Sequence, residues 1–173
     1  MRLAMPGSGK APLIYTAEER QRRDSSPWTV VQGVLAPVQF LVFLISLSLV
    51  VRYLSVGEGA SAAQTSVLVK TMVLYLIMVT GCIWEKVVFG QYLFAPAFYW
   101  EDVFSMLVLA LHTAYVLAVY WNLMSTRELM WLALAAYAAY VVNAIQFVLK
   151  LRAARRDERV RGHVVEQQVG IAA

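Results

Sequence analysis

Residues 81–115 read GCIWEKVVFGQYLFAPAFYWEDVFSMLVLALHTAY, and this stretch decides the fold. Two long apolar runs meet here, joined by a connector, residues 85–102, that is rich in Phe, Tyr and Trp. Charged side chains stand only at the borders of the connector: Glu85, Lys86, Glu101 and Asp102. A solvated loop would carry more charge, so we expect two membrane helices joined by a segment that lies in the membrane interface or folds back into the bundle.

The composition indicates a membrane protein. The chain has 173 residues, of which 60% are hydrophobic and 15% charged, and its mean hydropathy is +0.61. Soluble domains carry about 45–50% apolar and about 25% charged residues. The net charge of +4 is concentrated near the two ends of the chain, which argues against nucleic-acid binding. A single cysteine, Cys82, excludes an internal disulfide and any multi-cysteine metal site.

Four apolar runs are each long enough, at roughly 20 residues, to cross a bilayer. They cover residues 28–54, 67–84, 103–121 and 129–149. Basic residues are dense before the first run and after the last, so the positive-inside rule places both termini in the cytoplasm. We therefore predict an all-α integral membrane protein with four transmembrane helices in a bundle (28–150), a polar cytoplasmic N-terminal segment (1–27), a basic cytoplasmic tail (151–173) and an aromatic interfacial connector between helices 2 and 3.

Local signals refine the ends of these elements. Thr16 is placed to cap a short helix before the first span, and Ser26 with Pro27 marks a stop and a new start. Residues 55–66, which contain two glycines, are expected to form a loop. Lys70, near the predicted start of the second span, is expected to reach the interface with its flexible side chain.

Polar residues recur on the inner faces of the first and last spans. Gln32, Gln39 and Ser46 are seven residues apart, which aligns them for helix–helix hydrogen bonds or for a pocket wall. The fourth span carries a similar polar stripe, whose members are three or four residues apart: Tyr137, Tyr140, Asn143, Gln146 and Lys150.

Ionisable groups in or beside a membrane span are candidates for function because they are costly to bury. Glu101 and Asp102 share a helical face with His112, roughly two to three turns away, so they are expected to line opposite ends of one cavity. Helix-dipole stabilisation of the acids and simple bundle hydrogen bonding by His112 are the alternative interpretations. One histidine in a span excludes a bis-histidine haem, and no Glu-x-x-His pairs are present for a di-iron site.

Such a cavity, with aromatic walls, suits a large flat ligand. A neutral histidine nitrogen can bind a central metal ion, and a partly buried carboxylic acid can deliver a proton. A pigment- or quinone-binding assembly subunit without catalysis would use the same residues. A small transporter is disfavoured because no inverted repeat is visible.

Three stretches, residues 15–40, 81–115 and 130–155, resemble the 3-vinyl (bacterio)chlorophyllide hydratases of bacteriochlorophyll biosynthesis. The most specific motif is EKVVFGQYLFAPAFYWEDVFSM, which begins at Glu85. The resemblance implies that water adds to the C3 vinyl group of the ring to give a 1-hydroxyethyl group, without a cofactor. It also implies a multi-pass protein of the bacterial cytoplasmic or intracytoplasmic photosynthetic membrane. Its expected partners are the chlorophyllide substrate, the lipid bilayer and neighbouring pigment-biosynthesis enzymes.

This reaction suggests a role for each candidate residue. Protonation of the terminal vinyl carbon needs a carboxylic acid, for which Glu85 and Glu101 are the candidates. Asp102 is expected to stabilise the resulting cation or activate the water, and His112 to bind the substrate magnesium or position the water. The expected substrate contacts are Tyr140, Asn143 and Gln146 with water or the propionate and keto groups, Lys86 with the propionate or simply with Glu85, and Phe94, Tyr99 and Trp100 with the ring.

Overall fold

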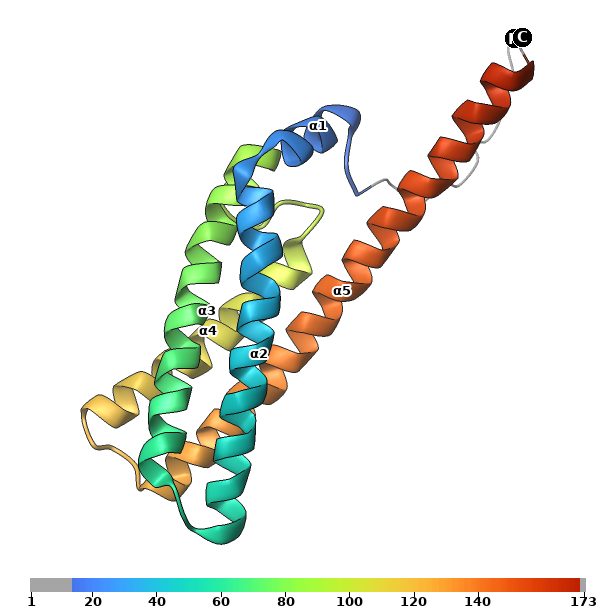
Figure 1. The fold of residues 1–173 in the computed structure, drawn as a ribbon. Coiled ribbons are helices and arrows are strands. Elements are labelled where there is room, and N and C mark those ends of the chain that lie inside the picture. Colours follow the sequence, from blue (N-terminus) through green and yellow to red (C-terminus); the bar gives the residue numbers. More distant parts are fainter. Residues whose placement is uncertain (1–13, 172–173) are drawn as a thin grey trace, which may run out of the picture.

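The computed structural model describes residues 14–171, with side chains up to Arg156 and at Arg159. Predictions on residues 1–13 and 172–173 lie outside this part. The described chain is all-helical (Figure 1), with α1 at Ala17–Ser25, α2 at Pro27–Val56, α3 at Ala60–Phe89, α4 at Tyr99–Tyr120 and α5 at Thr126–Ile171. In α2, α3, α4 and the Thr126–Arg156 part of α5, length and hydropathy suffice to cross a membrane. The prediction of four apolar spanning helices is therefore confirmed.

The bundle consists of two antiparallel helix pairs (Figure 1). Helix α2 packs along α3, and α4 packs along α5. The short turns between α2 and α3 and between α4 and α5 lie at one end of the bundle. Helix α1, residues 90–98 and the C-terminal half of α5 lie at the other end, which we call the connector end.

The helix starts follow from capping. The Thr16 hydroxyl accepts the backbone N–H of Glu19, and the Glu19 carboxylate accepts that of Thr16, which forms a reciprocal capping box at the start of α1. Ser26 caps α2, and Pro27 occupies its first turn, where a missing N–H costs nothing. Both predicted starts are confirmed, and α2 continues as a helix through Pro37.

The predicted loops were too long. The loop expected at 55–66 shrinks to three residues between Val56 and Ala60, and Gly57 and Gly59 both adopt φ +81° there, a conformation that suits glycine. The connector expected at 85–102 shrinks to residues 90–98. Helix α3 continues to Phe89 and ends at Gly90, whose φ is +85°.

The end of the last predicted span, at residue 149, is also not a helix end. Helix α5 runs without a break to Ile171. The sequence LRAARR after Lys150 consists of strong helix formers, so nothing stops the helix where the apolar run ends. The basic tail therefore starts as a continuation of α5.

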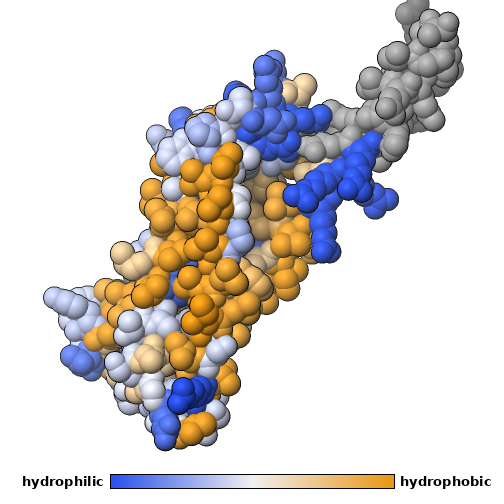
Figure 2. Space-filling view, in the orientation of Figure 1, coloured by the Kyte–Doolittle hydropathy of each residue, from blue (hydrophilic) through white to orange (hydrophobic). Residues whose placement is uncertain are grey.

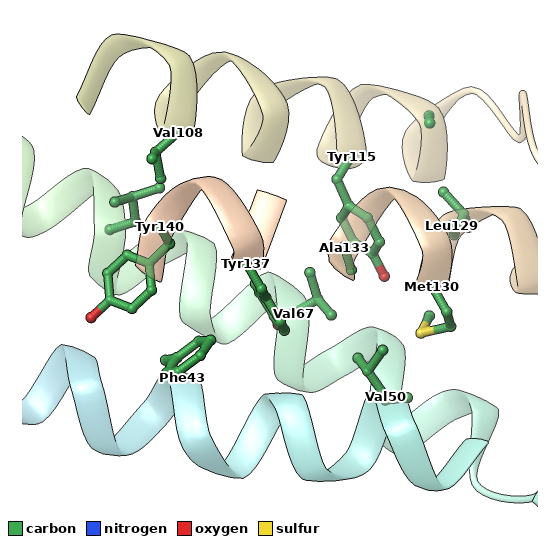
Figure 3. Close-up of a cluster of buried hydrophobic side chains, with 13 residues drawn as sticks. Phe43, Val50, Val67, Val108, Tyr115, Leu129, Met130, Ala133, Tyr137 and Tyr140 are labelled. Carbon is green, nitrogen blue, oxygen red and sulfur yellow. The ribbon is translucent and has the colours of Figure 1, made fainter. Parts of the chain in front are cut away.

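Side chains from all four long helices fill the core (Figure 3). Phe43, Val67, Tyr115 and Tyr137 are among its buried members. The Ser46 hydroxyl lies 2.7 Å from that of Ser66 and 2.6 Å from that of Tyr137, which joins α2 to α3 and α5. Figure 2 shows the matching exterior, with an apolar band across the middle and hydrophilic residues gathered at both ends.

Two of the three polar residues on the inner face of α2 form helix–helix hydrogen bonds, and the third does not. The Gln32 amide donates to the Thr80 hydroxyl on α3 at 2.7 Å, so Gln32, like Ser46, serves helix–helix hydrogen bonding. Gln39, on the same face, is buried, but neither polar atom of its amide has a partner among the described residues.

Candidate active site

The site is built around two carboxyl groups at the connector end. Glu85 lies in the last turns of α3 and Asp102 in the first turn of α4. Both are buried, with exposed fractions of only 6% and 4%. The two carboxyl groups lie close enough to each other to form a hydrogen bond. A hydrogen bond between carboxyl groups needs a proton, because an ionised carboxylate only accepts. A pair bonded in this way shares one proton.

Two backbone N–H groups of the connector donate hydrogen bonds to this pair. The Phe94 N–H donates to Asp102 Oδ2 at 2.6 Å, and the Ala95 N–H donates to Glu85 Oε2 at 3.5 Å. Phe94 has φ +60°, which is uncommon for a non-glycine residue, and its hydrogen bond to Asp102 helps to hold this conformation. The much shorter bond to Asp102 favours the negative charge there and leaves the proton on Glu85.

Glu101 is arranged differently from its neighbour. Its Oε1 forms an ion pair with Lys150 Nζ on α5 at 3.1 Å, whereas its buried Oε2 has no partner among the described residues. One turn further along α4, the Ser105 hydroxyl accepts the Asn143 amide at 2.9 Å. These two links join α4 to α5 beside the carboxyl pair.

His112 lies deeper in the bundle and faces a lysine. Its Nδ1 donates to the backbone oxygen of Val108 at 2.8 Å, so its Nε2 is the acceptor, and Lys70 Nζ lies 2.7 Å from that atom. Lys70 is fully buried, with its ammonium 4.2 Å from the centre of the Tyr140 ring. Both nitrogens of His112 are thus engaged.

The expectation that Lys70 reaches the interface is wrong. Helix α3 begins at Ala60 rather than near residue 67, so Lys70 lies almost three turns inside it. The spacing of Ala63, Val67, Lys70 and Leu74 repeats every three or four residues and marks one buried face. This spacing in the sequence indicates that Lys70 is buried, whereas its charge alone favours an exposed position.

The predicted shared face of α4 is confirmed, because Glu101, Asp102, Ser105 and His112 are all buried. The structure does not bring these groups into one contact network, however. Among the described residues, no hydrogen bond or ion pair joins His112 to a carboxylate. The acids gather at the connector end, whereas His112 belongs to a separate centre with Lys70 and Tyr140.

Four of the predicted site residues lie on the surface of the connector end. Lys86 is exposed and donates to the backbone oxygen of Gly90 at 2.7 Å, so it does not pair with Glu85. The rings of Phe94, Tyr99 and Trp100 are exposed and pack against one another, with centroids 5.7 and 5.5 Å apart. We call these three residues the aromatic patch.

A second set of aromatic side chains, not predicted as part of the site, packs next to the carboxyl pair. Phe89 is one turn after Glu85, and Phe98 is one turn before Asp102. Tyr15 stacks on Phe89 at 5.7 Å with the rings only 13° apart. The cluster draws on four separate segments, so no single helical periodicity could reveal it: Tyr15, Trp84, Phe89, Phe98 and Phe147.

The ion pair at this end is expected to stabilise the bundle. Lys150→Met leaves Glu101 buried without its cation, so the free energy of unfolding should fall by about 2 kcal/mol, less than for a fully buried pair because Lys150 is partly exposed. Thermal unfolding in detergent measures this. Arg52→Met is the matched control, because its 3.8 Å pair with Glu58 is exposed and should contribute no measurable stability. Equal losses in both variants would contradict a special role for Lys150.

These observations define a class: a protein whose described residues are all-helical, with four apolar helices long enough to span a membrane and a buried carboxyl pair at one end. The family model described as 2-vinyl bacteriochlorophyllide hydratase matches residues 15–153. The chain belongs to this family, which confirms the resemblance, although the family description numbers the vinyl position 2 rather than 3.

Two relatives support the assignment. The chain is 62% identical over 154 residues to the 2-vinyl bacteriochlorophyllide hydratase of Rhodobacter capsulatus, covering 87% of this chain and 90% of the relative. It is also 62% identical over 154 residues to the protein of the same name from Cereibacter sphaeroides, covering 88% and 96% of the two chains. No solved structure matches the chain.

Proposed function

We propose that this protein is a hydro-lyase of bacteriochlorophyll biosynthesis that adds water to the ring vinyl group of a (bacterio)chlorophyllide and gives the 1-hydroxyethyl product. Its family and its two hydratase relatives, each 62% identical over most of the chain, support this reaction. The observation that carries the mechanism is the buried Glu85–Asp102 pair, because hydration needs one group that gives a proton and one that takes a proton back.

In the proposed mechanism the Glu85 carboxyl protonates the terminal vinyl carbon. The π electrons of the double bond form the new C–H bond, and a cation remains on the carbon attached to the ring, where the macrocycle delocalises it. The negative charge of Asp102 stabilises this cation. A water oxygen then bonds to the cationic carbon and releases a proton to the carboxyl pair, which regains the single proton it started with. No redox cofactor enters this balance.

Glu101 and His112 take supporting roles in this proposal. Glu101 carries its charge in the ion pair with Lys150, so it suits electrostatic stabilisation better than proton donation. His112 ligates no metal in this arrangement, since binding the substrate magnesium would require it to give up the bond from Lys70. We therefore assign His112 to positioning within the bundle.

The ring is proposed to lie against the aromatic patch. The rings of the patch are exposed. The backbone of the connector, which carries Phe94 of the patch, bonds directly to both carboxyl groups, so the patch lies next to the acid pair. Lys86, which is exposed in the last turn of α3, is proposed to meet the substrate propionate. Asn143 and Gln146 remain proposed contacts for water or for polar groups of the ring.

The connector end is proposed to face the cytoplasm. Cationic residues gather there on α1 and on α5, where Figure 2 shows hydrophilic surface, whereas Arg52 near the end of α2 and Arg127 at the start of α5 belong to the opposite end. Both termini are then cytoplasmic, in the bacterial cytoplasmic or intracytoplasmic photosynthetic membrane. A pigment made by cytoplasmic enzymes would reach the site from this side, and neighbouring pigment-biosynthesis enzymes are the expected partners.

The function is tested with isotopically labelled water. Membranes containing the protein are incubated with 3-vinyl chlorophyllide in water enriched in heavy oxygen, and membranes without it serve as the control. We expect the pigment to gain one labelled water and its red absorption band to move to the blue. Tight pigment binding without label would instead favour a pigment-binding assembly subunit.

A further inference from the structure

Five buried polar atoms on α2, α4 and α5 have no hydrogen-bond partner among the described residues. They are Gln39 Nε2 and Oε1, Glu101 Oε2, Asn143 Oδ1 and Gln146 Oε1. Gln39 is only 2% exposed and Glu101 only 7%. Leaving a polar group buried and unpaired costs about 1–3 kcal/mol, and the bilayer core offers no water from outside. Such a set indicates a ligand that completes the bonds.

The helix register brings these atoms together. On α5, Gln146 lies between Asn143, which bonds to Ser105, and Lys150, which bonds to Glu101. Helices α2 and α5 run antiparallel, with Ser46 against Tyr137 and the Phe43 ring 4.9 Å from that of Tyr140. One further turn along both helices places Gln39 beside residues 143–144. This register brings Gln39 near Asn143 and Gln146, and the bonds between α4 and α5 bring Glu101 to the same part of α5.

The chemistry of the atoms identifies the ligand. Four of the five are oxygens that accept hydrogen bonds, so the ligand must donate more than one hydrogen. The keto and carboxylate groups of the pigment have no hydrogen to give, and the carboxylate would also be repelled by Glu101. Water donates two hydrogen bonds and accepts two, and it is the small uncharged ligand that buried polar clusters hold in proteins.

We propose that Gln39, Glu101, Asn143 and Gln146 form the binding site for water as the second substrate of the hydratase, with Gln39 as a positioning residue. This inference rests on the proposed function and adds the source of the attacking oxygen. The water lies on the Glu101 side of the carboxyl pair, and the Lys70–His112 centre closes the inner end of the site. Water then reaches the cation from inside the bundle, whereas the pigment arrives from the connector end.

Gln39→Leu tests the site, because leucine keeps most of the volume and removes both polar atoms. We expect kcat for hydration to fall about tenfold or more as the water loses its position. Pigment affinity, measured by the shift of the red band on titration, should stay within about twofold. The melting temperature should change little, because leucine fills most of the same volume and leaves no buried amide that needs a partner. Gln146→Leu should reproduce the loss of kcat.

Gln32→Leu is the matched control, because it makes the same change on the same face of α2 but breaks only the bond to Thr80. Its kcat should stay near that of the wild type. If Gln39→Leu does not fold, Gln39→Met makes the same removal with a more adaptable side chain.

Wild-type kcat in a folded Gln39 variant, a pigment affinity that falls in step with kcat, or an equal loss in Gln32→Leu would overturn the proposed water site. These outcomes differ from a failure of the proposed function, in which the wild-type protein itself incorporates no label from heavy-oxygen water and the water site falls with it.

Discussion

Glu85→Gln is expected to lower kcat for vinyl hydration by about 10²–10⁴-fold, the usual contribution of a positioned general acid. The glutamine amide has the same shape and can still donate a hydrogen bond to Asp102, so folding and pigment affinity should be kept. It cannot give up a proton to the vinyl carbon. Label incorporation from heavy-oxygen water, followed over time with purified protein, measures the rate.

Glu58→Gln is the matched control for this substitution. Glu58 lies in the exposed turn between α2 and α3, at the end of the bundle opposite the carboxyl pair, and pairs only loosely with Arg52. Its rate should equal that of the wild type. A Glu85→Gln protein that hydrates at the wild-type rate would remove Glu85 from the mechanism and return Glu101 as the candidate acid.

His112→Leu is expected to produce the largest loss of stability. It leaves Lys70 fully buried with no acceptor, and the cost should be about 3 kcal/mol in the free energy of unfolding. The double variant Lys70→Met/His112→Leu should recover most of that loss, because two apolar side chains leave no polar group unpaired. Unfolding in detergent by heat or denaturant measures both.

Lys86→Met provides the comparison on the same helix, where removal of an exposed lysine should change stability by less than about 0.5 kcal/mol. A double variant no more stable than His112→Leu alone would show that Lys70 and His112 do not act as a pair. A wild-type hydration rate in the folded double variant would further agree with a positioning role for His112 rather than a catalytic one.

The spans were predictable because long apolar runs and helix caps act locally. Thr16 and Ser26 fixed two helix starts from the sequence alone. The two ends of α3 were not predictable, because the charges of Lys70 and Glu85 are typical of a membrane boundary. Both lie inside α3 since partners on α4 satisfy them. The partner of Lys70 is 42 residues away, a distance over which no local pattern reports contact.

The site was predictable in part for the same reason. Helical periodicity correctly placed Glu101 and Asp102 on the buried face of α4. The contact between Glu85 and Asp102 depends on how the connector folds, including the φ of +60° at Phe94, which the sequence does not indicate. Trp100 is exposed because it precedes Asp102 by two residues and so faces away from it on the helix.

In the proposed mechanism, Glu85 carries the shared proton of the buried carboxyl pair. Infrared difference spectroscopy of the purified protein measures this directly, through the carbonyl stretch of a protonated carboxylic acid and its shift in heavy water. We predict that this band is present in the wild type, disappears in Glu85→Gln and remains in Glu101→Gln. A band that survives in Glu85→Gln, or one that is lost in Glu101→Gln, would contradict the claim.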